Sequence, residues 1–381
     1  MLPPPRPPMR DYLLADDLSG ALDAAAAFHR AGRRVRIVWS REAWDAAAPD
    51  TFVAYTTETR NADPATAAAQ VGAVIAHAQS CGGKLCFKKI DSTLRGPVAA
   101  ELGAVAAAMP DARILFAPAN PAVGRTVRAG CLLVRGVPVA ETEFARDPLS
   151  PVRESELRAF VGALAGDRIV IPDTATAADF AASVLRMEEG GPNWIPVGSG
   201  ALARAVAERS ARPAMARTDP PSTVAAGPIL LVCGSAHPLN RAQAEELHRQ
   251  RSVPVCELRI EDIAGTVRAA VDSLGRSGSV SLVVGATRTD SSVALRAIAE
   301  ATAQIIAEAK VRRLFVTGGE SAFAICRALE IPALDLMAEL EPGVCLAQTV
   351  TREGGRLLAV KPGGFGGTAT WVRVWDKLRE T

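Results

Sequence analysis

The stretch LCFKKIDSTLRGPVAAEL, residues 85–102, holds the pattern that decides the fold. Its first part, Leu85–Ile90, is a short apolar run that predicts a β-strand. Residues Pro97–Met109 are rich in alanine with a helical period, and a proline is well tolerated near a helix start. Between them, the turn Lys88–Gly96 gathers three cations, one acid and two hydroxyls. Such polarity directly after an apolar strand is not explained by core packing. It marks a candidate binding site, because ligands of open parallel sheets bind beyond the carboxyl ends of the strands.

The same alternation of apolar runs and Ala-rich segments extends along the whole chain. In the first half we expect strands at Tyr12–Ala15, Val35–Trp39, Phe52–Thr56, Leu85–Ile90 and Ile114–Ala117, and helices at Gly20–Ala31, Pro64–Gln79 and Pro97–Met109. In the second half we expect strands at Ile229–Cys233, Val253–Leu258, Val280–Val284, Leu314–Val316, Val344–Val350 and Leu357–Val360, and helices at Pro238–Arg249, Asp262–Leu274, Ser291–Ala309 and Ser321–Leu329. Two β runs about Arg135-Gly136, within Cys131–Val139, predict a hairpin inserted at the sheet edge. Strands and helices that alternate in this way predict an α/β fold with mostly parallel sheets flanked by helices.

The length of the chain, 381 residues, predicts two domains, because one hydrophobic core usually stops growing at roughly 250–300 residues. The stretch 211–227 contains three prolines and little periodicity, which is typical of a linker. We therefore expect a flexible tail at 1–10, a first domain at 11–210, the linker at 211–227 and a second domain at 228–381.

Composition and net charge indicate which partners and which cellular compartment to expect. With 43 Lys and Arg against 41 Asp and Glu, the net charge of +2 excludes a broad basic face, so nucleic acid is not an expected partner. The seven cysteines are scattered and form no Cys/His cluster with metal-ligand spacing, which favours a reducing cytoplasm. No run of about 18 apolar residues indicates a membrane helix.

Further polar groups follow the other predicted strands of the first half. Asp16 and Asp17 come directly after the first strand, where a carboxylate could bind or deprotonate a substrate hydroxyl. The alternative is that Asp17 or Ser19 only caps the next helix. Arg60 follows the Phe52–Thr56 strand, so it would join the cations of the Lys88–Gly96 turn. With the free N–H groups of a helix start, this set predicts a site for a small anion.

The second half has glycine turns in place of charge clusters. Residues 233–237, 317–321 and 361–367 each follow a strand and offer backbone N–H groups, which suits the close approach of a nucleotide. None is a Walker A motif and none is the Gly-x-Gly-x-x-Gly dinucleotide fingerprint. For His237 we favour a structural role at the helix start over catalysis.

Together these motifs resemble those of the four-carbon acid sugar kinases, which phosphorylate threonate, erythronate or 3-oxo-tetronate on the terminal hydroxyl with ATP. The motifs that carry the resemblance are Ala15–Ala21, Lys88–Gly96 with Glu101-Leu102, Pro121–Thr126, Gly136–Pro138, Glu141–Pro148, Gly234-Ser235, Thr317–Gly319 and Lys361–Gly366. They follow the order of the family along nearly the whole chain.

The resemblance implies that the first domain binds the sugar acid, that the second binds ATP, and that the active site lies in a cleft between them. Carried over by position, the substrate-binding residues are Asp16, Arg60, Lys88, Lys89, Ile90, Asp91, Ser92 and Arg95, with Asp17 as the catalytic residue. The residues that contact ATP are Ser235, Thr317, Gly318, Gly319, Glu320, Lys361, Gly363 and Gly364. Phosphoryl transfer of this kind usually needs Mg²⁺, whose ligands the sequence does not identify. A homodimer is one option for the assembly.

Two departures from the family pattern leave other functions open. Glu320 stands where the family usually has Asp, and Ala236-His237 stands where it usually has Cys-Ser. A sugar-acid sensor without phosphoryl transfer is therefore an alternative. A nicotinamide-dependent dehydrogenase is a second one, although the missing dinucleotide fingerprint counts against it.

Overall fold

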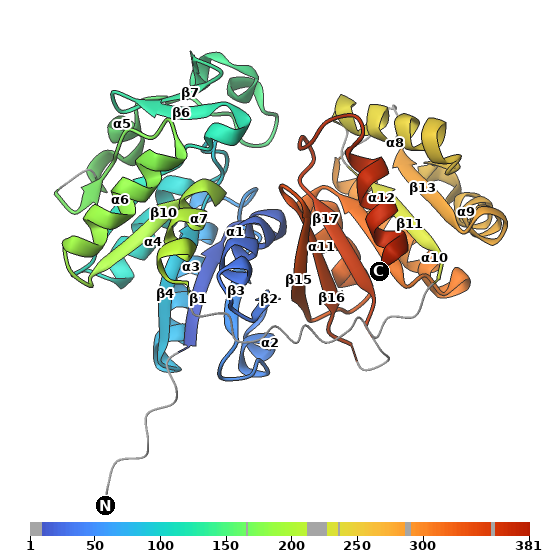
Figure 1. Ribbon diagram of the computed structural model, residues 1–381, viewed down its shortest axis with the longest axis horizontal. Helices are drawn as coiled ribbons and strands as arrows, with labels where there is room; N and C mark the ends of the chain where they lie inside the picture. The colour runs from blue at the N-terminus through green and yellow to red at the C-terminus, as the bar shows by residue number, and fades with distance from the viewer. Residues whose placement is uncertain (1–9, 165–166, 212–226, 235–236, 286–290, 352–354) are drawn as a thin grey trace, which may run out of the picture. The chain divides into compact units, whose positions relative to one another are not determined.

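The computed structural model describes residues 10–164, 167–211, 227–234, 237–285, 291–351 and 355–381. The chain divides into two compact units, Met1–Met215 and Ala216–Thr381 (Figure 1). The predicted tail 1–10 and linker 211–227 lie outside the described residues, apart from Arg10, Ala211 and Gly227. Within the described ranges, no helix combines the length and the apolar character needed to cross a lipid bilayer.

The N-terminal unit is built on a parallel sheet in the order β2-β3-β1-β4-β10-β5-β9. Its strands are β1 (Arg10–Ala15), β2 (Val35–Val38), β3 (Phe52–Thr56), β4 (Gly83–Lys89), β5 (Arg113–Ala117), β9 (Ile169–Val170) and β10 (Trp194–Gly198). Its helices are α1 (Leu18–Arg30), α2 (Arg41–Asp45), α3 (Pro64–Ser80), α4 (Val98–Ala108), α5 (Leu157–Val161), α6 (Ala177–Glu189) and α7 (Gly200–Arg209). The strands and helices predicted for this half are confirmed, with ends that shift by a few residues. Helix α2 was not predicted, and no bounds were predicted for β9, β10, α5, α6 and α7.

The hairpin predicted within Cys131–Val139 is confirmed as β7 (Cys131–Val134) and β8 (Val137–Pro138). Arg135 and Gly136 have φ angles of 51° and 84°, which is the left-handed conformation that a two-residue hairpin turn requires. The predicted place at the edge of the main sheet is wrong. The hairpin pairs instead with β6 (Arg125–Arg128) and forms a separate three-stranded antiparallel sheet. We call the segment from residue 121 to residue 156 the insertion.

The C-terminal unit has its own sheet in the order β12-β13-β11-β14-β17-β16-β15. Its strands are β11 (Ile229–Cys233), β12 (Val255–Leu258), β13 (Ser279–Val284), β14 (Arg313–Thr317), β15 (Ala333–Glu341), β16 (Val344–Thr349) and β17 (Leu357–Lys361). Its helices are α8 (Pro238–Arg251), α9 (Ile263–Ser277), α10 (Ser291–Ala309), α11 (Gly319–Ala328) and α12 (Thr370–Glu380). The first five strands in this order are parallel, whereas β15, β16 and β17 pair antiparallel. Strand β15 and helix α12 were not predicted.

The two sheets share one feature that places the candidate sites. The order β2-β3-β1-β4 of the first unit is repeated as β12-β13-β11-β14 in the second. In each unit the chain leaves the first strand toward one side of the sheet and then returns to its other side. The carboxyl end of that strand is therefore a topological switch point, where parallel sheets bind their ligands. The sites are expected after β1 in one unit and after β11 in the other.

Candidate functional site

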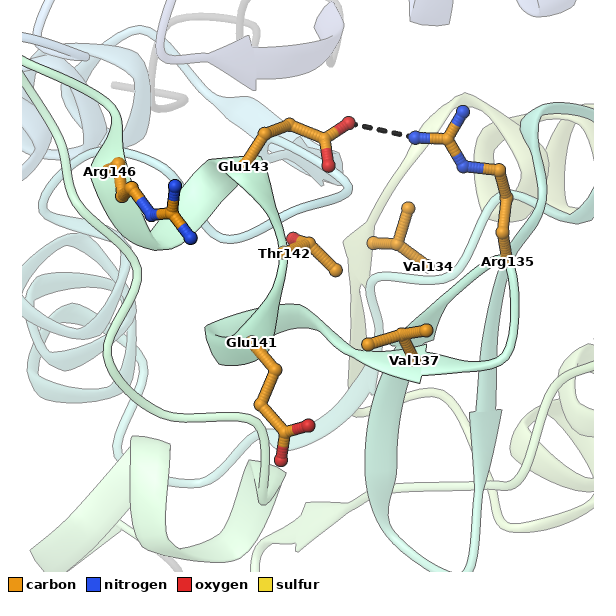
Figure 2. A pocket seen from close by; sticks show the side chains of 7 residues that line it. All are labelled: Val134, Arg135, Val137, Glu141, Thr142, Glu143 and Arg146. Carbon is orange, nitrogen blue, oxygen red and sulfur yellow. Dashed lines mark hydrogen bonds and ion pairs between the residues drawn. The ribbon is translucent and has the colours of Figure 1, made fainter.

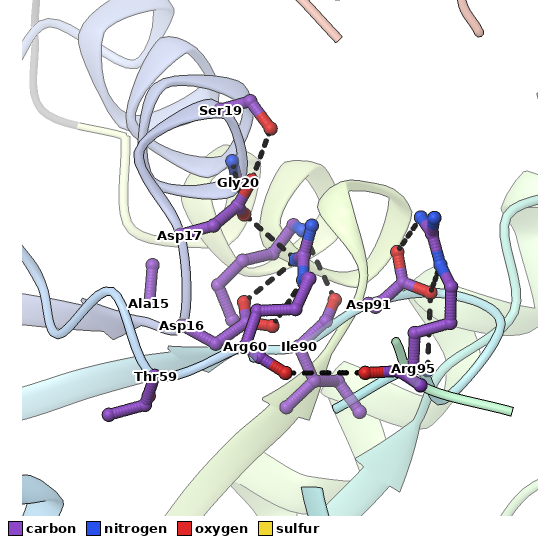
Figure 3. Close-up of polar contacts among 12 residues, drawn as sticks. Ala15, Asp16, Asp17, Ser19, Gly20, Thr59, Arg60, Ile90, Asp91 and Arg95 are labelled. Carbon is purple, nitrogen blue, oxygen red and sulfur yellow. Dashed lines mark hydrogen bonds and ion pairs between the residues drawn. The ribbon is translucent and has the colours of Figure 1, made fainter. Parts of the chain in front are cut away.

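Three polar segments of the N-terminal unit meet at the switch point after β1. Ala15 pairs with Thr56 of β3 on one side and with Lys89 of β4 on the other, so the three strands end in register. The residues that follow these strands therefore lie side by side, as Figure 3 shows for Asp16, Arg60 and Asp91. This is the convergence that the sequence predicted.

Arg60 is the centre of the cluster. Its Nε and one terminal nitrogen donate to the two carboxylate oxygens of Asp16 at 2.8 and 3.0 Å, and the same terminal nitrogen lies 2.8 Å from Oδ1 of Asp17. Burial acts to raise the pKa of Asp16, but the charges of Arg60, Lys88 and Lys89 outweigh it and hold this pKa below its usual range. Both aspartate side chains are buried. Arg60 contacts both carboxylates and so holds them in place.

Asp17 has a structural role in addition to its contact with Arg60. Its Oδ1 accepts a hydrogen bond of 2.8 Å from the backbone N–H of Gly20, and its Oδ2 accepts one from the Ser19 hydroxyl. It is therefore the N-cap of α1, as the alternative interpretation expected. A Cβ atom at Gly20 would lie 2.5 Å from the Asp17 carboxylate and 3.1 Å from Nζ of Lys89. Glycine is therefore favoured here because any side chain would first collide with the Asp17 carboxylate that caps α1.

Asp91 folds the turn that follows β4. Its carboxylate accepts hydrogen bonds from the backbone N–H and the hydroxyl of Thr93 and from two nitrogens of the Arg95 guanidinium. Burial acts to raise the pKa of Asp91, but Arg95, Arg60 and Arg125 hold this pKa well below its usual value. The carboxylate is thus ionised and already paired, and it fixes where the cations of the turn point.

The insertion brings a further cation to this turn, from the motif Pro121–Thr126, which was not among the predicted substrate-binding residues. Arg125, the first residue of β6, donates to the hydroxyl of Ser92. The guanidinium groups of Arg95 and Arg125 lie 5.6 and 5.3 Å from the ring centre of Phe144, within cation–π range. Phe144 thereby ties the insertion to the cluster.

Lys88 lies behind the cluster rather than in it. Its Nζ is 2.6 Å from a carboxylate oxygen of Glu101 in α4, and both side chains are 1% exposed or less. Glu101 also accepts a hydrogen bond from the hydroxyl of Thr59. Because the ammonium of Lys88 is paired with Glu101, it is not available to a ligand at the turn. The buried ion pair holds α4 against β4. Ile90 is buried as well, and its carbonyl accepts from Nζ of Lys89 at 3.1 Å.

Glu58 is a site residue that the sequence analysis passed over. It has a φ angle of 53° directly after β3, a strained conformation for a residue other than glycine. Its Oε1 accepts a hydrogen bond of 2.6 Å from the hydroxyl of Thr56. Burial and the negative charges of Asp17 and Asp16 raise the pKa of Glu58 to about 8. A positive φ angle has no sequence signal in a glutamate, so only the structure reveals this group.

A cavity of about 350 Å³ lies within the insertion (Figure 2). Its lining residues are Val134, Arg135, Val137, Glu141, Thr142, Glu143 and Arg146. Arg135 and Glu143 form an ion pair of 2.9 Å at its rim. The lining includes none of the predicted substrate-binding residues, so the cavity belongs to the insertion and is separate from the cluster around Arg60.

The glycine turns of the C-terminal unit are also aligned by the sheet. Thr317 of β14 pairs with Cys233 of β11 on one side and with Lys361 of β17 on the other. Gly318 has a φ angle of 105°, which only glycine adopts readily, and it leads into α11 at Gly319. The predicted contact Ser235 lies outside the described residues.

This turn fits a phosphate-bearing ligand. The N-terminus of α11 presents backbone N–H groups and the positive end of the helix dipole. The hydroxyl of Thr317 is buried and has no hydrogen-bond partner within the described part of the chain. Glu320 lies exposed in the first turn of the same helix. Buried hydroxyl groups are normally paired, so Thr317 is suited to donate to a ligand oxygen.

Lys361 supports the last glycine turn from inside. Its Nζ lies 3.0 Å from Oδ1 of Asn240 and 3.0 Å from each of the carbonyl oxygens of Pro362, Gly363 and Phe365. Burial lowers the pKa of Lys361 to about 8. Through these four hydrogen bonds, the side chain of Lys361 stabilises the turn. Gly364 of the same turn is exposed and lies beside the ring of His237. His237 is the N-cap of α8 and accepts from the N–H of Leu239, which agrees with the structural role predicted for it.

Comparison with known proteins assigns a different family model to each of the two units. Residues 12–166 match a family model described as a sugar-binding N-terminal domain, and residues 230–370 match a nucleotide-binding C-terminal domain. Among curated proteins, a D-threonate kinase of Bordetella bronchiseptica is 30% identical over 97% of both chains. A D-threonate kinase of Cupriavidus necator is 32% identical over 97% of this chain and 98% of its own. A 3-oxo-tetronate kinase of Methylobacterium radiotolerans is 28% identical over 96% and 98%.

Solved structures agree with these relatives. A Bordetella bronchiseptica protein of the DUF1537 family, crystallised with citrate as a domain-swapped dimer, is 29% identical with a TM-score of 0.50 and 98% coverage of both chains. A Haemophilus influenzae protein of the same family has a TM-score of 0.69 at 19% identity, covers 96% of this chain and 100% of its own, and so shares the fold. The chain therefore belongs to the four-carbon acid sugar kinase family, with a sugar-binding N-terminal unit and a nucleotide-binding C-terminal unit.

Proposed function

We propose that this protein transfers the γ-phosphoryl group of ATP to the terminal hydroxyl of a four-carbon sugar acid: threonate, erythronate or 3-oxo-tetronate. The observation that carries the proposal is the cluster after β1, where Arg60 holds two buried aspartates among further cations. Two relatives with at least 30% identity are D-threonate kinases, so D-threonate is the first acid to test.

In this mechanism the cations of the cluster hold the anion. Four cations (Arg60, Lys89, Arg95 and Arg125) meet four carboxylates there: Asp16, Asp17, Asp91 and Asp147, which lies 3.7 Å from Arg95. These charges balance before the substrate binds, so directed N–H donors rather than a surplus charge hold the single carboxylate of a sugar acid. Arg60 and Lys89 hold that carboxylate, and Asp17 accepts or orients the proton of the terminal hydroxyl. Arg60 also fixes the direction in which Asp17 presents its oxygens.

The nucleotide is held by the turns after β14 and β17. The hydroxyl of Thr317 and the amides of Gly318 and Gly319 would contact its phosphates, with Gly363 and Gly364 on the neighbouring turn. Mg²⁺, which prefers oxygen ligands, would neutralise charge on the phosphates. Glu320 is the carboxylate of the same turn and would offer such a ligand. Lys361 acts through the turn that it stabilises.

A coupled ADP-release assay with D-threonate, D-erythronate and 3-oxo-tetronate tests the proposal. We expect ADP formation that needs one of these acids and Mg²⁺. Tight binding of an acid without turnover would favour the sensor instead. Binding of NADH would favour the dehydrogenase.

Two accompanying proposals concern the setting of the reaction. Because a relative forms a domain-swapped dimer, we propose a homodimer, which light scattering of the purified protein can test. ATP as a substrate and seven cysteines that are all free of disulfides favour a cytoplasmic location.

The pH dependence of substrate binding is expected to follow the ionisation of the Glu58 carboxyl group. Below its pKa of about 8 this side chain is neutral, and above it a further carboxylate makes the cluster less favourable for an anion. The KM for the sugar acid should therefore rise about threefold to tenfold from pH 7 to pH 9, since about one pKa unit of interaction is tenfold in affinity. The variant Glu58→Gln should show a flat KM over this range. A wild-type KM that does not change with pH would contradict the expectation.

A further inference from the structure

Three metal-ligating side chains meet on the N-terminal unit, away from the cluster around Arg60. They are Asp45, the last residue of α2; His77, in the last turn of α3; and Cys81, the residue that ends α3. Their ligand atoms all lie within 4.8 Å of one another. The expectation that no Cys/His cluster has metal-ligand spacing is wrong here, since His77 and Cys81 are one helical turn apart; Asp45 lies 32 positions before His77 and joins them only in the fold.

The group is preorganised by the helices that carry it. His77 and Cys81 are four residues apart, so they point from the same face of α3. The imidazole of His77 packs edge-on against the buried ring of Trp44, with 6.1 Å between ring centres, and its Nε2 lies 3.2 Å from Oδ1 of Asp45. The carbonyl of Trp44 accepts a hydrogen bond from Arg10, which fastens the end of α2 to β1.

The separations suit a tetrahedral ion. With zinc bonds of about 2.0–2.1 Å to nitrogen and oxygen and 2.3 Å to sulfur, tetrahedral angles place N and O about 3.4 Å apart and S about 3.6 Å from either. The observed 3.2 Å between His77 and Asp45 is already at this value. The other separations are at most 4.8 Å, which leaves up to about 1.2 Å to close. Asp45 is 59% exposed and Cys81 is partly exposed, so both side chains can rotate to close it.

The place of the group separates it from the proposed reaction. Cys81 lies just before the first residue of β4, whereas the turn with Asp91 follows the last residue of the same strand. The seven residues of β4 span about 20 Å at 3.3 Å per residue. A metal at this end of the sheet would therefore not touch the substrate.

We propose that Asp45, His77 and Cys81 form a binding site for Zn²⁺ or a similar transition-metal ion, with water as the fourth ligand. The donor set excludes Mg²⁺ as the natural occupant, because imidazole and thiolate select borderline and soft ions and Mg²⁺ prefers oxygen. The ion joins the end of α2 to the end of α3, two helices that are otherwise linked here by the contact of Asp45 and Trp44 with His77. Its expected effect is to stabilise the N-terminal unit.

The test is a titration of the chelator-treated, full-length protein with Co²⁺ in excess Mg²⁺, followed by displacement with Zn²⁺. We expect one Co²⁺ per chain, with the visible bands of tetrahedral cobalt and a thiolate-to-cobalt charge-transfer band. Zn²⁺ should raise the melting temperature and slow the alkylation of Cys81. The variants His77→Ala, Cys81→Ser and Asp45→Asn should each weaken binding at least tenfold.

A matched control separates this site from any partly exposed thiol. Cys86 is also partly exposed, but burial and the charge of Asp11 raise its pKa to about 12, so it stays a protonated thiol. The variant Cys86→Ser should bind Co²⁺ as the wild type does. The proposal is overturned if no thiolate charge-transfer band develops, or if Cys81→Ser and Asp45→Asn, at a partly exposed and an exposed position, bind as tightly as the wild type.

Discussion

The variant Asp17→Asn is expected to lower kcat for the sugar acid by roughly 100- to 10,000-fold, the range that loss of a general base or proton-orienting group produces. Asparagine keeps the shape of the side chain but cannot take a proton from the terminal hydroxyl. The ADP-release assay at saturating acid and ATP measures the effect. A kcat within threefold of wild type would remove Asp17 from this role.

The comparison of Asp17→Asn with Asp17→Ala separates catalysis from helix capping. Asparagine is as good an N-cap as aspartate, so the hydrogen bond from the N–H of Gly20 is kept. Alanine loses it, which should cost about 1 kcal/mol in the free energy of unfolding. Both variants should therefore lose activity alike and differ in stability, as urea unfolding can measure.

The variant Lys88→Met is expected to destabilise the N-terminal unit by about 3–5 kcal/mol, because it leaves the carboxylate of Glu101 buried without its partner. Both side chains are at most 1% exposed, so water cannot replace the lost ammonium. Urea unfolding followed by circular dichroism measures the loss. If Lys88 contacts substrate instead, the variant will raise KM without lowering stability.

The double variant Lys88→Met, Glu101→Gln provides the control. It removes both charges, and glutamine still offers an oxygen to the hydroxyl of Thr59, which donates to Glu101 in the wild type. Much of the lost stability should return, because a neutral pair of similar volume often replaces a buried ion pair at little cost. Failure to recover would mean that Lys88 stabilises the fold by packing rather than by charge.

The fold and the meeting of the site residues could be predicted well from the sequence, because both follow from the local pattern of apolar runs and turns. Apolar runs and turns identify the strands, and parallel strands bring the residues that follow them to one edge. The positions of Asp16, Arg60 and Asp91 therefore followed from the strand ends alone. Two of the elements that were not predicted have weak patterns: α2 is five residues long, and β15 mixes charged and apolar residues. Helix α12 was missed although its buried residues Trp371, Trp375 and Leu378 recur at helical spacing.

The partners of single side chains could not be predicted in this way. Lys88 looks like its neighbour Lys89, yet it faces Glu101 on the next helix, because the side chains of successive strand residues point to opposite faces of a sheet. Lys361 was expected to contact the phosphates of ATP, but its ammonium donates hydrogen bonds to carbonyl oxygens of its own turn. Each of these contacts depends on which way a side chain points, which composition and spacing do not encode.

The shared strand order of the two units has a consequence for how such an enzyme can change. The same scaffold uses mainly charged side chains after β1, β3 and β4 in one unit and mainly backbone N–H groups after β14 and β17 in the other. Side chains can be exchanged one at a time, whereas a backbone cradle tolerates little beyond glycine. A new acid acceptor should thus be reachable by redesigning a few positions of the first unit, while the phosphate donor stays the same. Changes of acceptor specificity are therefore expected in the side chains of the N-terminal unit, and the backbone turns of the C-terminal unit are expected to be retained.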